Sequence, residues 1–390
     1  MTASQRWRNL GIASGAVTAA LFAIYDIYQW AQAYASDHFH NDFTFYYVAA
    51  RLGLAHGWPS LYNLALQQQG LDAIGSQIKV AQLARYISPP PLAWLALPFT
   101  ALPYEVAYWL WSALLLLALG FAWYLVAPAA GRARAIFLVA AIGWLPVIYG
   151  LQLGQPGLFV ALAIAASYAL LGAGRDFWAG VVLGALALKP QLAFLVPPAL
   201  LIARKDRAFF GSVVSIGLLA LASVLALGAG GVSDYLARLN FASGVPVNRE
   251  LTLAALVGNI AITRAVQVAI ALWALVLVRR LGRTKVEWIF IPALVGGALA
   301  TPYLHIDDLV MIGLAGWLYL RTSARPAWIW AYVLAIVLAA EGLPIWGPAP
   351  LILLELGGLV LMSVAAAQPS RAALTLPQID ARPLELRQRP

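Results

Sequence analysis

Apolar residues gather into about a dozen runs along the chain, and shorter polar segments separate them. The longest runs reach the roughly 17–25 residues that a helix needs to cross a bilayer. The pattern therefore predicts an all-α polytopic membrane protein of about 12 transmembrane helices, built as a single domain over residues 1–367. The runs lie at residues 10–34, 104–126, 134–150, 156–172, 176–188, 191–203, 208–229, 261–278, 286–300, 308–320, 326–343 and 348–367.

Three of these runs leave alternatives open. The runs 176–188 and 191–203 are short, and Lys189-Pro190 separates them, so they are either two short or tilted helices or a re-entrant pair. The first run follows two arginines and ends near Ala33-Tyr34-Ala35, as a signal peptide would. Because it is longer than the roughly 7–15 apolar residues of a signal peptide, we predict a retained first helix; cleavage is the alternative.

Composition supports the membrane prediction. Of the 390 residues, 62% are hydrophobic and 11% are charged, whereas soluble domains have roughly 45–50% apolar and 25% charged residues. The chain has no cysteine, which excludes a disulfide framework and a cysteine metal site. A net charge of +9 does not by itself indicate nucleic-acid binding, because basic cytoplasmic loops are typical of membrane proteins.

The basic residues predict the orientation. With the N-terminus inside, most of them fall on the cytoplasmic side, whereas most acidic residues fall outside. We therefore predict a multi-pass protein of the plasma (inner) membrane with both termini cytoplasmic. The basic residues placed inside are Arg6, Arg8, Arg132, Arg134, Arg175, Arg204, Lys205, Arg207, Arg279, Arg280, Arg283, Lys285, Arg321, Arg325, Arg371, Arg382, Arg387 and Arg389.

The same orientation makes two of the connections long outer loops, at residues 35–103 and 230–260. The first is rich in aromatic residues and leucine, which suggests amphipathic helices lying at the membrane interface. Residues 368–390 contain Pro, Gln and Arg without apolar periodicity, so we predict a flexible cytoplasmic tail.

Asp42 is the first candidate for chemistry. It begins an aromatic stretch in which Asp42, Tyr46 and Ala49 share one face of a helix. A carboxylate at the mouth of an apolar bundle could act as a general base, and burial would raise its pKa. The alternative is an aspartate that only caps a helix.

Three further segments carry polar side chains between apolar runs. Gln152 and Gln155 lie in a glycine-rich turn that could bind sugar hydroxyls or merely connect two helices. Lys189 has few polar residues near it in the sequence, so its charge either binds a phosphate or extends to the membrane interface. Arg249 could also bind a phosphate, or it could pair with Glu250.

The fourth segment, Thr301 to Asp308, places a histidine beside two carboxylates. His305, Asp307 and Asp308 could bind phosphate, move a proton or ligate a cation. We also expect at least one of the two aspartates to cap the following helix. The topology puts this segment on the same side of the membrane as Asp42, Gln155, Lys189 and Arg249, which predicts one site built from several loops.

These motifs together resemble glycosyltransferase family 87, whose members have the GT-C fold. The resemblance rests on Asp42 to Tyr47 and on Ala49-Ala50, followed by Gly57, Pro59, Leu61 and Tyr62. It continues through Pro89 to Leu92, Gly154-Gln155, Gly180 and Gly184 before Lys189-Pro190, and Thr301-Pro302 to His305. It covers most of residues 40–310. It implies a GT-C-like bundle with a helical extracytoplasmic first loop.

The resemblance also implies an activity: inverting transfer of a hexose or pentose from a polyprenyl-phosphate donor to a lipid or glycan acceptor on the extracytoplasmic face. Asp42 would be the base, Lys189, His305 and Arg249 would hold the donor phosphate, and Tyr46, Gln152, Gln155 and Asp308 would contact sugar or acceptor. The sequence Asn248-Arg249-Glu250-Leu251 departs from the Asn-Gln-Ser-like pattern expected in relatives, so no particular sugar is predicted.

No glycine-rich nucleotide fingerprint is present in the sequence. We therefore expect no cofactor and no metal, with the lipid-phosphate sugar as the only activated substrate and no nucleic-acid partner. A multi-span transporter or flippase of envelope precursors is the alternative, and a non-catalytic assembly subunit is another. Transporters often contain repeated halves with polar groups near the midplane, whereas here the polar candidates lie at the predicted outer ends of the helices.

Overall fold

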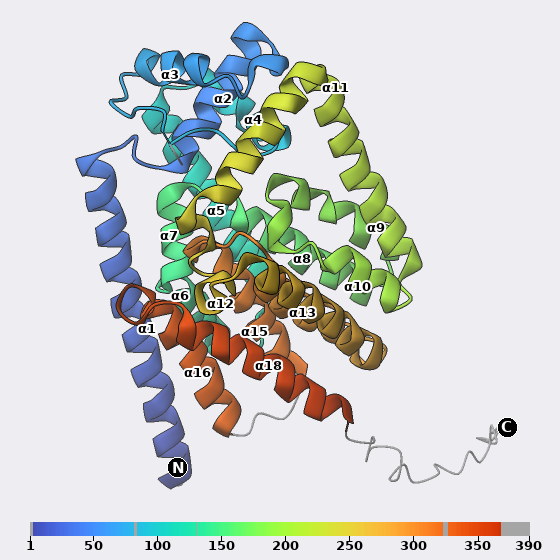
Figure 1. Cartoon of the computed structure of the whole chain (residues 1–390). Coiled ribbons are helices and arrows are strands. Elements are labelled where there is room, and N and C mark those ends of the chain that lie inside the picture. Colours follow the sequence, from blue (N-terminus) through green and yellow to red (C-terminus); the bar gives the residue numbers. More distant parts are fainter. Residues whose placement is uncertain (1–2, 82–83, 130, 323–326, 368–390) are drawn as a thin grey trace, which may run out of the picture.

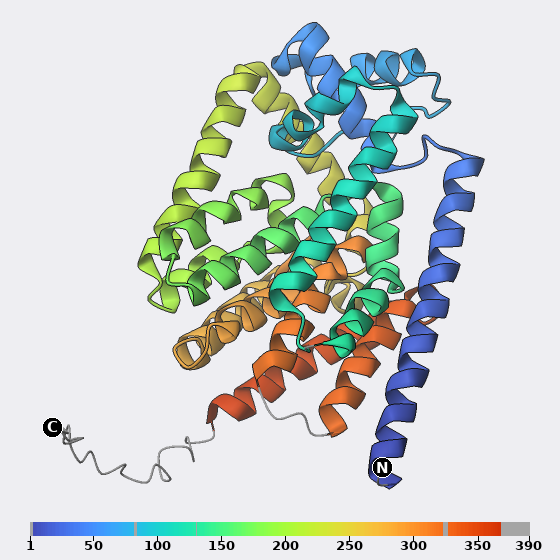
Figure 2. The same ribbon diagram turned by 180° about the vertical axis from the view of Figure 1, so that it is seen from behind.

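The computed structural model describes residues 3–81, 84–129, 131–322 and 327–367, and this part of the chain is almost entirely helical. Its only extended pairing is an isolated bridge between Ala81 and Ala84. Helices α2, α3 and α4 form a cap at one end of the bundle, and the N-terminus lies at the opposite end (Figures 1 and 2). The tail predicted at 368–390 lies outside the described residues.

The α-helices differ widely in length. They are α1 (Ala3–Ser36), α2 (Asp42–His56), α3 (Leu64–Ala73), α4 (Pro90–Ala96), α5 (Tyr104–Val126), α6 (Arg132–Ile142), α7 (Leu145–Leu153), α8 (Gly157–Gly172), α9 (Asp176–Val181), α10 (Val196–Ile202), α11 (Asp206–Gly244), α12 (Ala254–Val257), α13 (Ile260–Leu281), α14 (Glu287–Ala300), α15 (Val310–Thr322), α16 (Ala327–Glu341), α17 (Leu343–Trp346) and α18 (Ala349–Ala367).

Short 3-10 helices occupy several connections between them. They are η1 (Trp58–Ser60), η2 (Leu97–Ala101), η3 (Val182–Leu188), η4 (Pro190–Leu192), η5 (Pro246–Arg249) and η6 (Ile306–Leu309).

Four helices within the described residues are long and apolar enough to cross a membrane: α5, α11, α13 and α18. Helices α6 and α7 would make a fifth span if the pair, which is bent by 55°, is counted as one. Shorter apolar helices include α8, α14 and most of α16. The chain is therefore a helical membrane protein, and the count of about 12 spans stays a prediction that depends on the shorter helices.

The predicted break at Lys189-Pro190 is confirmed. Helix α9 passes into η3, and the backbone leaves helical geometry at Lys189, where φ is −152°. Lys205 Nζ lies 3.5 Å from Asp176 Oδ2, so the two ends of this segment lie side by side. The segment therefore runs inward to Lys189 and returns, and each of its arms is shorter than the roughly 17–25 residues of a full span.

Helix α2 is buried more completely than an interfacial helix would be. Every side chain from Phe43 to Ala50 is buried, because α3, α4, η1 and η2 pack around it. Trp111 of α5 fixes this cap to the bundle. Its ring lies 5.2 Å from that of Phe43 and 5.3 Å from that of Phe159 of α8, and its Nε1 donates to the carbonyl of Gly154 at 2.8 Å.

The second predicted loop, residues 230–260, is largely helical. Helix α11 bends sharply at Gly228, where φ is +62°, and continues as a second arm to Gly244. This arm descends from the cap toward the centre of the bundle (Figure 1). Tyr235 on the arm stacks on Tyr62 of the cap with 4.9 Å between ring centroids. The arm thus connects the cap to η5, which carries Asn248 and Arg249.

Candidate functional site

Four breaks between helices bring their polar residues together beneath the cap. Asp42 is the first residue of α2, and Gln155 follows the end of α7. Lys189 separates η3 from η4, while Asp307 and Asp308 belong to η6. We call these five residues the Lys189 network. At a helix end or break the chain turns, so polar side chains there can point toward one another and not along the face of a helix.

Gln155 joins Asp42 to Lys189. Its Nε2 donates to Asp42 Oδ2, and its Oε1 accepts hydrogen bonds from Lys189 Nζ at 2.9 Å and from the hydroxyl of Tyr46 at 3.3 Å. The turn before it depends on Gly154, whose φ of +72° ends α7 in the left-handed region. A Cβ at Gly154 would lie 2.8 Å from Cβ of Phe43, so glycine also permits the close approach of α2.

Lys189 is held by two carboxylates. Its Nζ lies 2.6 Å from Asp307 Oδ2 and forms a second ion pair with Asp308. All three side chains are buried. Burial alone would lower the pKa of Lys189, but the charges of Asp307 and Asp308 outweigh it and raise that pKa, so the lysine stays charged. One cation faces two carboxylates, and a third carboxylate, Asp42, lies just beyond Gln155.

His305 is neutral and belongs to the same assembly. Burial lowers its pKa. Its backbone N–H donates to Asp308 Oδ2 at 2.9 Å, and its Nε2 lies 3.0 Å from Asn248 Oδ1. The Asn248 amide donates through Nδ2 to the carbonyl of Ala242 at 2.7 Å, which leaves Oδ1 as an acceptor. His305 Nε2–H therefore donates to Asn248.

Asp42 combines burial with an accessible oxygen. Burial is the main cause that raises the pKa of Asp42 to about 6; repulsion from Asp307 adds to it, while Lys189 and the hydrogen bond from Gln155 oppose it. The residue is half-buried, and among the described residues Asp42 Oδ1 has no hydrogen-bond partner. A carboxylate with a pKa near neutrality and a free lone pair can accept a proton from a bound hydroxyl.

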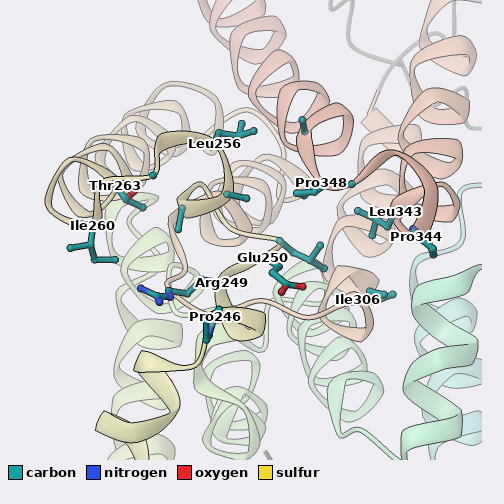
Figure 3. Close-up of a pocket in the computed structure, with 16 residues that line it drawn as sticks. Pro246, Arg249, Glu250, Leu256, Ile260, Thr263, Ile306, Leu343, Pro344 and Pro348 are labelled. Carbon is teal, nitrogen blue, oxygen red and sulfur yellow. The ribbon is translucent and has the colours of Figure 1, made fainter. Parts of the chain in front are cut away.

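Arg249 lies outside the Lys189 network but close to it. It lines a cavity of about 760 Å³ that also touches Ile306, the residue between His305 and Asp307. We call it the Arg249 cavity. Figure 3 shows Arg249 on one side of the cavity and the apolar Leu343 and Pro344 on another. The predicted alternative, an ion pair with Glu250, is not formed among the described residues; Arg249 Nη2 lies 3.5 Å from the carbonyl of Gly244.

Comparison with known proteins identifies the family. The family model of glycosyltransferase family 87 matches residues 86–340. The chain belongs to glycosyltransferase family 87. Searches of curated proteins and of solved structures found no match. Together with its apolar helices, this membership makes the protein a membrane glycosyltransferase, which moves a sugar from a donor to an acceptor.

Within this family 87 enzyme the match includes Gln155, Lys189, Arg249 and His305 but not Asp42. The structure joins Asp42 to the matched part through its hydrogen bond with Gln155. The alternative role of Asp42 as a helix cap is wrong, because Asn41 caps α2 by accepting from the backbone N–H of Thr44 at 3.1 Å.

Four other residues of the family 87 enzyme can be compared with the sequence analysis: Asp308, Gln152, Asp307 and Asn248. The N-cap of η6 is His305 and not one of the two aspartates, although Asp308, at the third position of η6, accepts a hydrogen bond from the backbone N–H of His305 as part of a capping box. The Gln152 carbonyl accepts from the hydroxyl of Tyr108 at 2.8 Å, and no hydrogen bond from its side-chain amide occurs within the described part. The sequence analysis named Asp307 only as one of the two aspartates beside His305, and it gave no site role to Asn248. The adjacent aspartates signalled a site without showing which one would pair with Lys189.

Proposed function

We propose that this enzyme transfers a hexose or pentose from a polyprenyl-phosphate donor to a lipid or glycan acceptor, with inversion at the anomeric carbon. The observation that carries the proposal is Asp42: a carboxylate with a raised pKa and a free oxygen, hydrogen-bonded to Gln155 within the family match. Asp42 is the first residue of the cap helix α2 and is half-buried, which limits the access of water that would compete with the acceptor.

In the proposed reaction Asp42 Oδ1 takes the proton of the acceptor hydroxyl. The acceptor oxygen forms a bond to the anomeric carbon while the bond between that carbon and the phosphate oxygen breaks. The bonding electrons leave with polyprenyl phosphate, whose charge needs a cation nearby. Attack opposite to the leaving group inverts the anomeric centre. The pKa of Asp42, about 6, suits a base that works near neutral pH.

Arg249 is the best placed of the three predicted phosphate ligands. The charge of Lys189 is already shared by Asp307 and Asp308, and His305 is neutral. Arg249 forms no ion pair among the described residues and lines a cavity whose other walls are mainly apolar. A cation beside apolar walls suits a lipid phosphate, with its prenyl chain along the walls. Phosphate binding by Lys189 and His305 remains a prediction.

Of the four residues predicted to bind sugar or acceptor, two lie beside Asp42 and two do not. Tyr46 and Gln155 adjoin Asp42 directly, so a hydroxyl bound to Asp42 would lie within their reach. Asp308 already pairs with Lys189, and the Gln152 contact to Tyr108 uses the backbone carbonyl of Gln152. Contacts from these two side chains to a sugar or an acceptor are therefore supported less directly. Lys189 is best described as a positioning residue, because it holds Gln155 through a 2.9 Å hydrogen bond.

The proposed membrane arrangement follows the charge bias. The cap and the Lys189 network would face the extracytoplasmic side of the plasma membrane, with both termini inside. The shorter apolar helices would complete about 12 spans in one domain over residues 1–367. Outer segments 35–103 and 230–260 would frame the site. Cysteines introduced at residue 37 and residue 284, which the charge bias places on opposite sides of the membrane, test this: a membrane-impermeant thiol reagent added to intact cells should label only the first.

A transfer assay in proteoliposomes tests the activity. We expect the purified enzyme to move labelled sugar from polyprenyl-phosphate hexose or pentose to lipid or glycan acceptors extracted from the envelope of its source, and mass spectrometry would identify the product. Transport of an intact donor without formation of a glycosidic product would favour the flippase alternative. If no polyprenyl-phosphate sugar is consumed with any extract, the proposed donor class is wrong.

The pH dependence of transfer should follow the ionisation of Asp42. Only the ionised carboxylate can accept a proton, and its pKa is raised to about 6. We therefore expect kcat/KM to be level above about pH 7 and to fall toward tenfold per pH unit below about pH 6. The charges of Lys189, Asp307 and His40 also affect the pKa of Asp42. Lys189 stays charged over this pH range, because its own pKa is raised. A profile that stays flat down to about pH 5 would contradict the assignment of Asp42.

Arg249→Gln should weaken donor binding more than catalysis. We expect KM for the polyprenyl-phosphate donor to rise by about tenfold or more, because a charge-assisted contact to phosphate is lost and Glu250 is left alone in the cavity. Steady-state kinetics with varied donor would measure it. Arg264→Gln is the matched control, since Arg264 is exposed on α13 and does not line the cavity. Equal effects of the two changes would refute phosphate binding by Arg249.

A further inference from the structure

A second charged cavity lies away from the Lys189 network, where α10 ends and α13 makes its last turns. It has a volume of about 750 Å³, and three arginines line it: Arg204, Arg279 and Arg283. None of the three guanidinium groups forms an ion pair with a carboxylate in the part of the chain that the structure describes. We call it the Arg279 cavity.

The rest of the Arg279 cavity is apolar. Leu272 and Val276 of α13 line it and are exposed by 59% and 47%. Leu272, Val276, Arg279 and Arg283 follow one another at spacings of four, three and four residues, so those on the helix form a single stripe along one face of α13. The stripe is apolar toward the middle of the helix and cationic at its end. This is the order of chemistry along a phospholipid, from acyl chain to headgroup.

Arg204 occupies a backbone position that favours glycine. It is the only non-glycine residue with positive φ among the described residues, at +62°. It ends α10 by donating its N–H to the carbonyl of Leu201, while Lys205 donates to Leu200. The same turn ends α7 at Gly154 and α8 at Gly174. An arginine in this conformation is less stable than glycine would be, which indicates that its side chain serves another purpose.

We propose that the Arg279 cavity binds an anionic phospholipid of the adjacent leaflet. The three arginines would hold the headgroup phosphate, and an acyl chain would lie along Leu272 and Val276. The two kinds of wall argue for a lipid over a free phosphate, which would leave the apolar stripe uncovered. The site is distinct from the Arg249 cavity, because Thr263 lines that cavity at the other end of α13, roughly 24 Å away along the helix.

Lipid binding to the purified full-length protein in detergent tests the proposal. The ligands are dioleoyl phosphatidylglycerol, dioleoyl phosphatidylcholine and inorganic phosphate, and native mass spectrometry with titration gives the affinity. We expect phosphatidylglycerol to bind in preference to the other two. Arg279→Gln and Arg204→Gly should each weaken its binding by about five- to tenfold. Arg280→Gln is the matched control, because Arg280 is the exposed neighbour of Arg279 and does not line the cavity.

Arg204→Gly separates a structural role from a binding role. Because glycine accepts the positive φ, we expect the lipid-free variant to melt at a temperature equal to or above that of wild type, even though it binds lipid less well. Three results would overturn the proposal: unchanged phosphatidylglycerol affinity in Arg204→Gly and Arg279→Gln, an equal loss in Arg280→Gln, or inorganic phosphate or phosphatidylcholine binding as tightly as phosphatidylglycerol. None of these readouts depends on sugar transfer.

Discussion

The Asp42→Asn variant is expected to transfer sugar about a thousandfold more slowly than the wild-type enzyme while it keeps its fold. The amide has the shape of the carboxylate but cannot accept the acceptor proton, and a general base contributes roughly 10²–10⁴-fold to rate. Folding should be preserved because Asn41, not Asp42, caps α2, and because a half-buried carboxylate becomes a neutral group. Single-turnover transfer from a polyprenyl-phosphate sugar would measure the rate.

Asp72→Asn is the matched control for this change. Asp72 lies on α3 in the same cap, is exposed, and pairs with Lys79 at 3.3 Å. We expect its transfer rate to stay within about twofold of wild type, since exposed ion pairs contribute little. Thermal unfolding in detergent would show that both variants are folded. Full activity in Asp42→Asn would exclude Asp42 as the base.

The Lys189→Met variant is expected to lose about 3–5 kcal/mol of stability. Methionine fills the same space but leaves Asp307 and Asp308 buried without their cation, and removal of one partner from a buried ion pair costs that much. Thermal or denaturant unfolding in detergent would detect the loss. The loss should appear in the absence of any substrate, which distinguishes a positioning lysine from one that only binds a donor phosphate.

A triple variant provides the complementary test. Lys189→Met combined with Asp307→Asn and Asp308→Asn removes the unpaired charges, so we expect it to regain most of the lost stability. Lys79→Met is the control, because Lys79 is 73% exposed in its ion pair with Asp72, and its loss should cost less than about 1 kcal/mol. If Lys189→Met unfolds at the wild-type temperature, the buried ion pairs do not hold η6 and the η3–η4 break together.

Part of the site could be predicted from sequence because polar residues that interrupt apolar runs are conspicuous. Asp42, Gln155, Lys189 and His305 all lie at such interruptions, next to helix ends, glycine or proline, and the structure brings them into one assembly. The apolar runs likewise gave the helices, as the agreement of the run 104–126 with α5 illustrates. The lengths of apolar runs and the polar residues that interrupt them can be seen in the local sequence, so both could be recognised without knowledge of the tertiary structure.

The pairings could not be predicted in the same way. Lys189 meets Asp307 across 118 positions of sequence, and nothing near Lys189 indicates that its counter-ions come from the protein and not from a phosphate. The burial of α2 on all sides and the bend of α11 at Gly228 depend on packing between distant elements. Arg249 was grouped with Lys189 and His305, but only the structure shows that it faces a separate cavity.

The most direct test of the account is the structure of the enzyme bound to a polyprenyl phosphonate that carries the sugar through a non-cleavable carbon link. We expect density for the phosphonate in the Arg249 cavity and for the sugar between that cavity and Asp42. Density for the bound sugar at another face of the bundle, with no part of the ligand near Arg249 or the Lys189 network, would contradict the account.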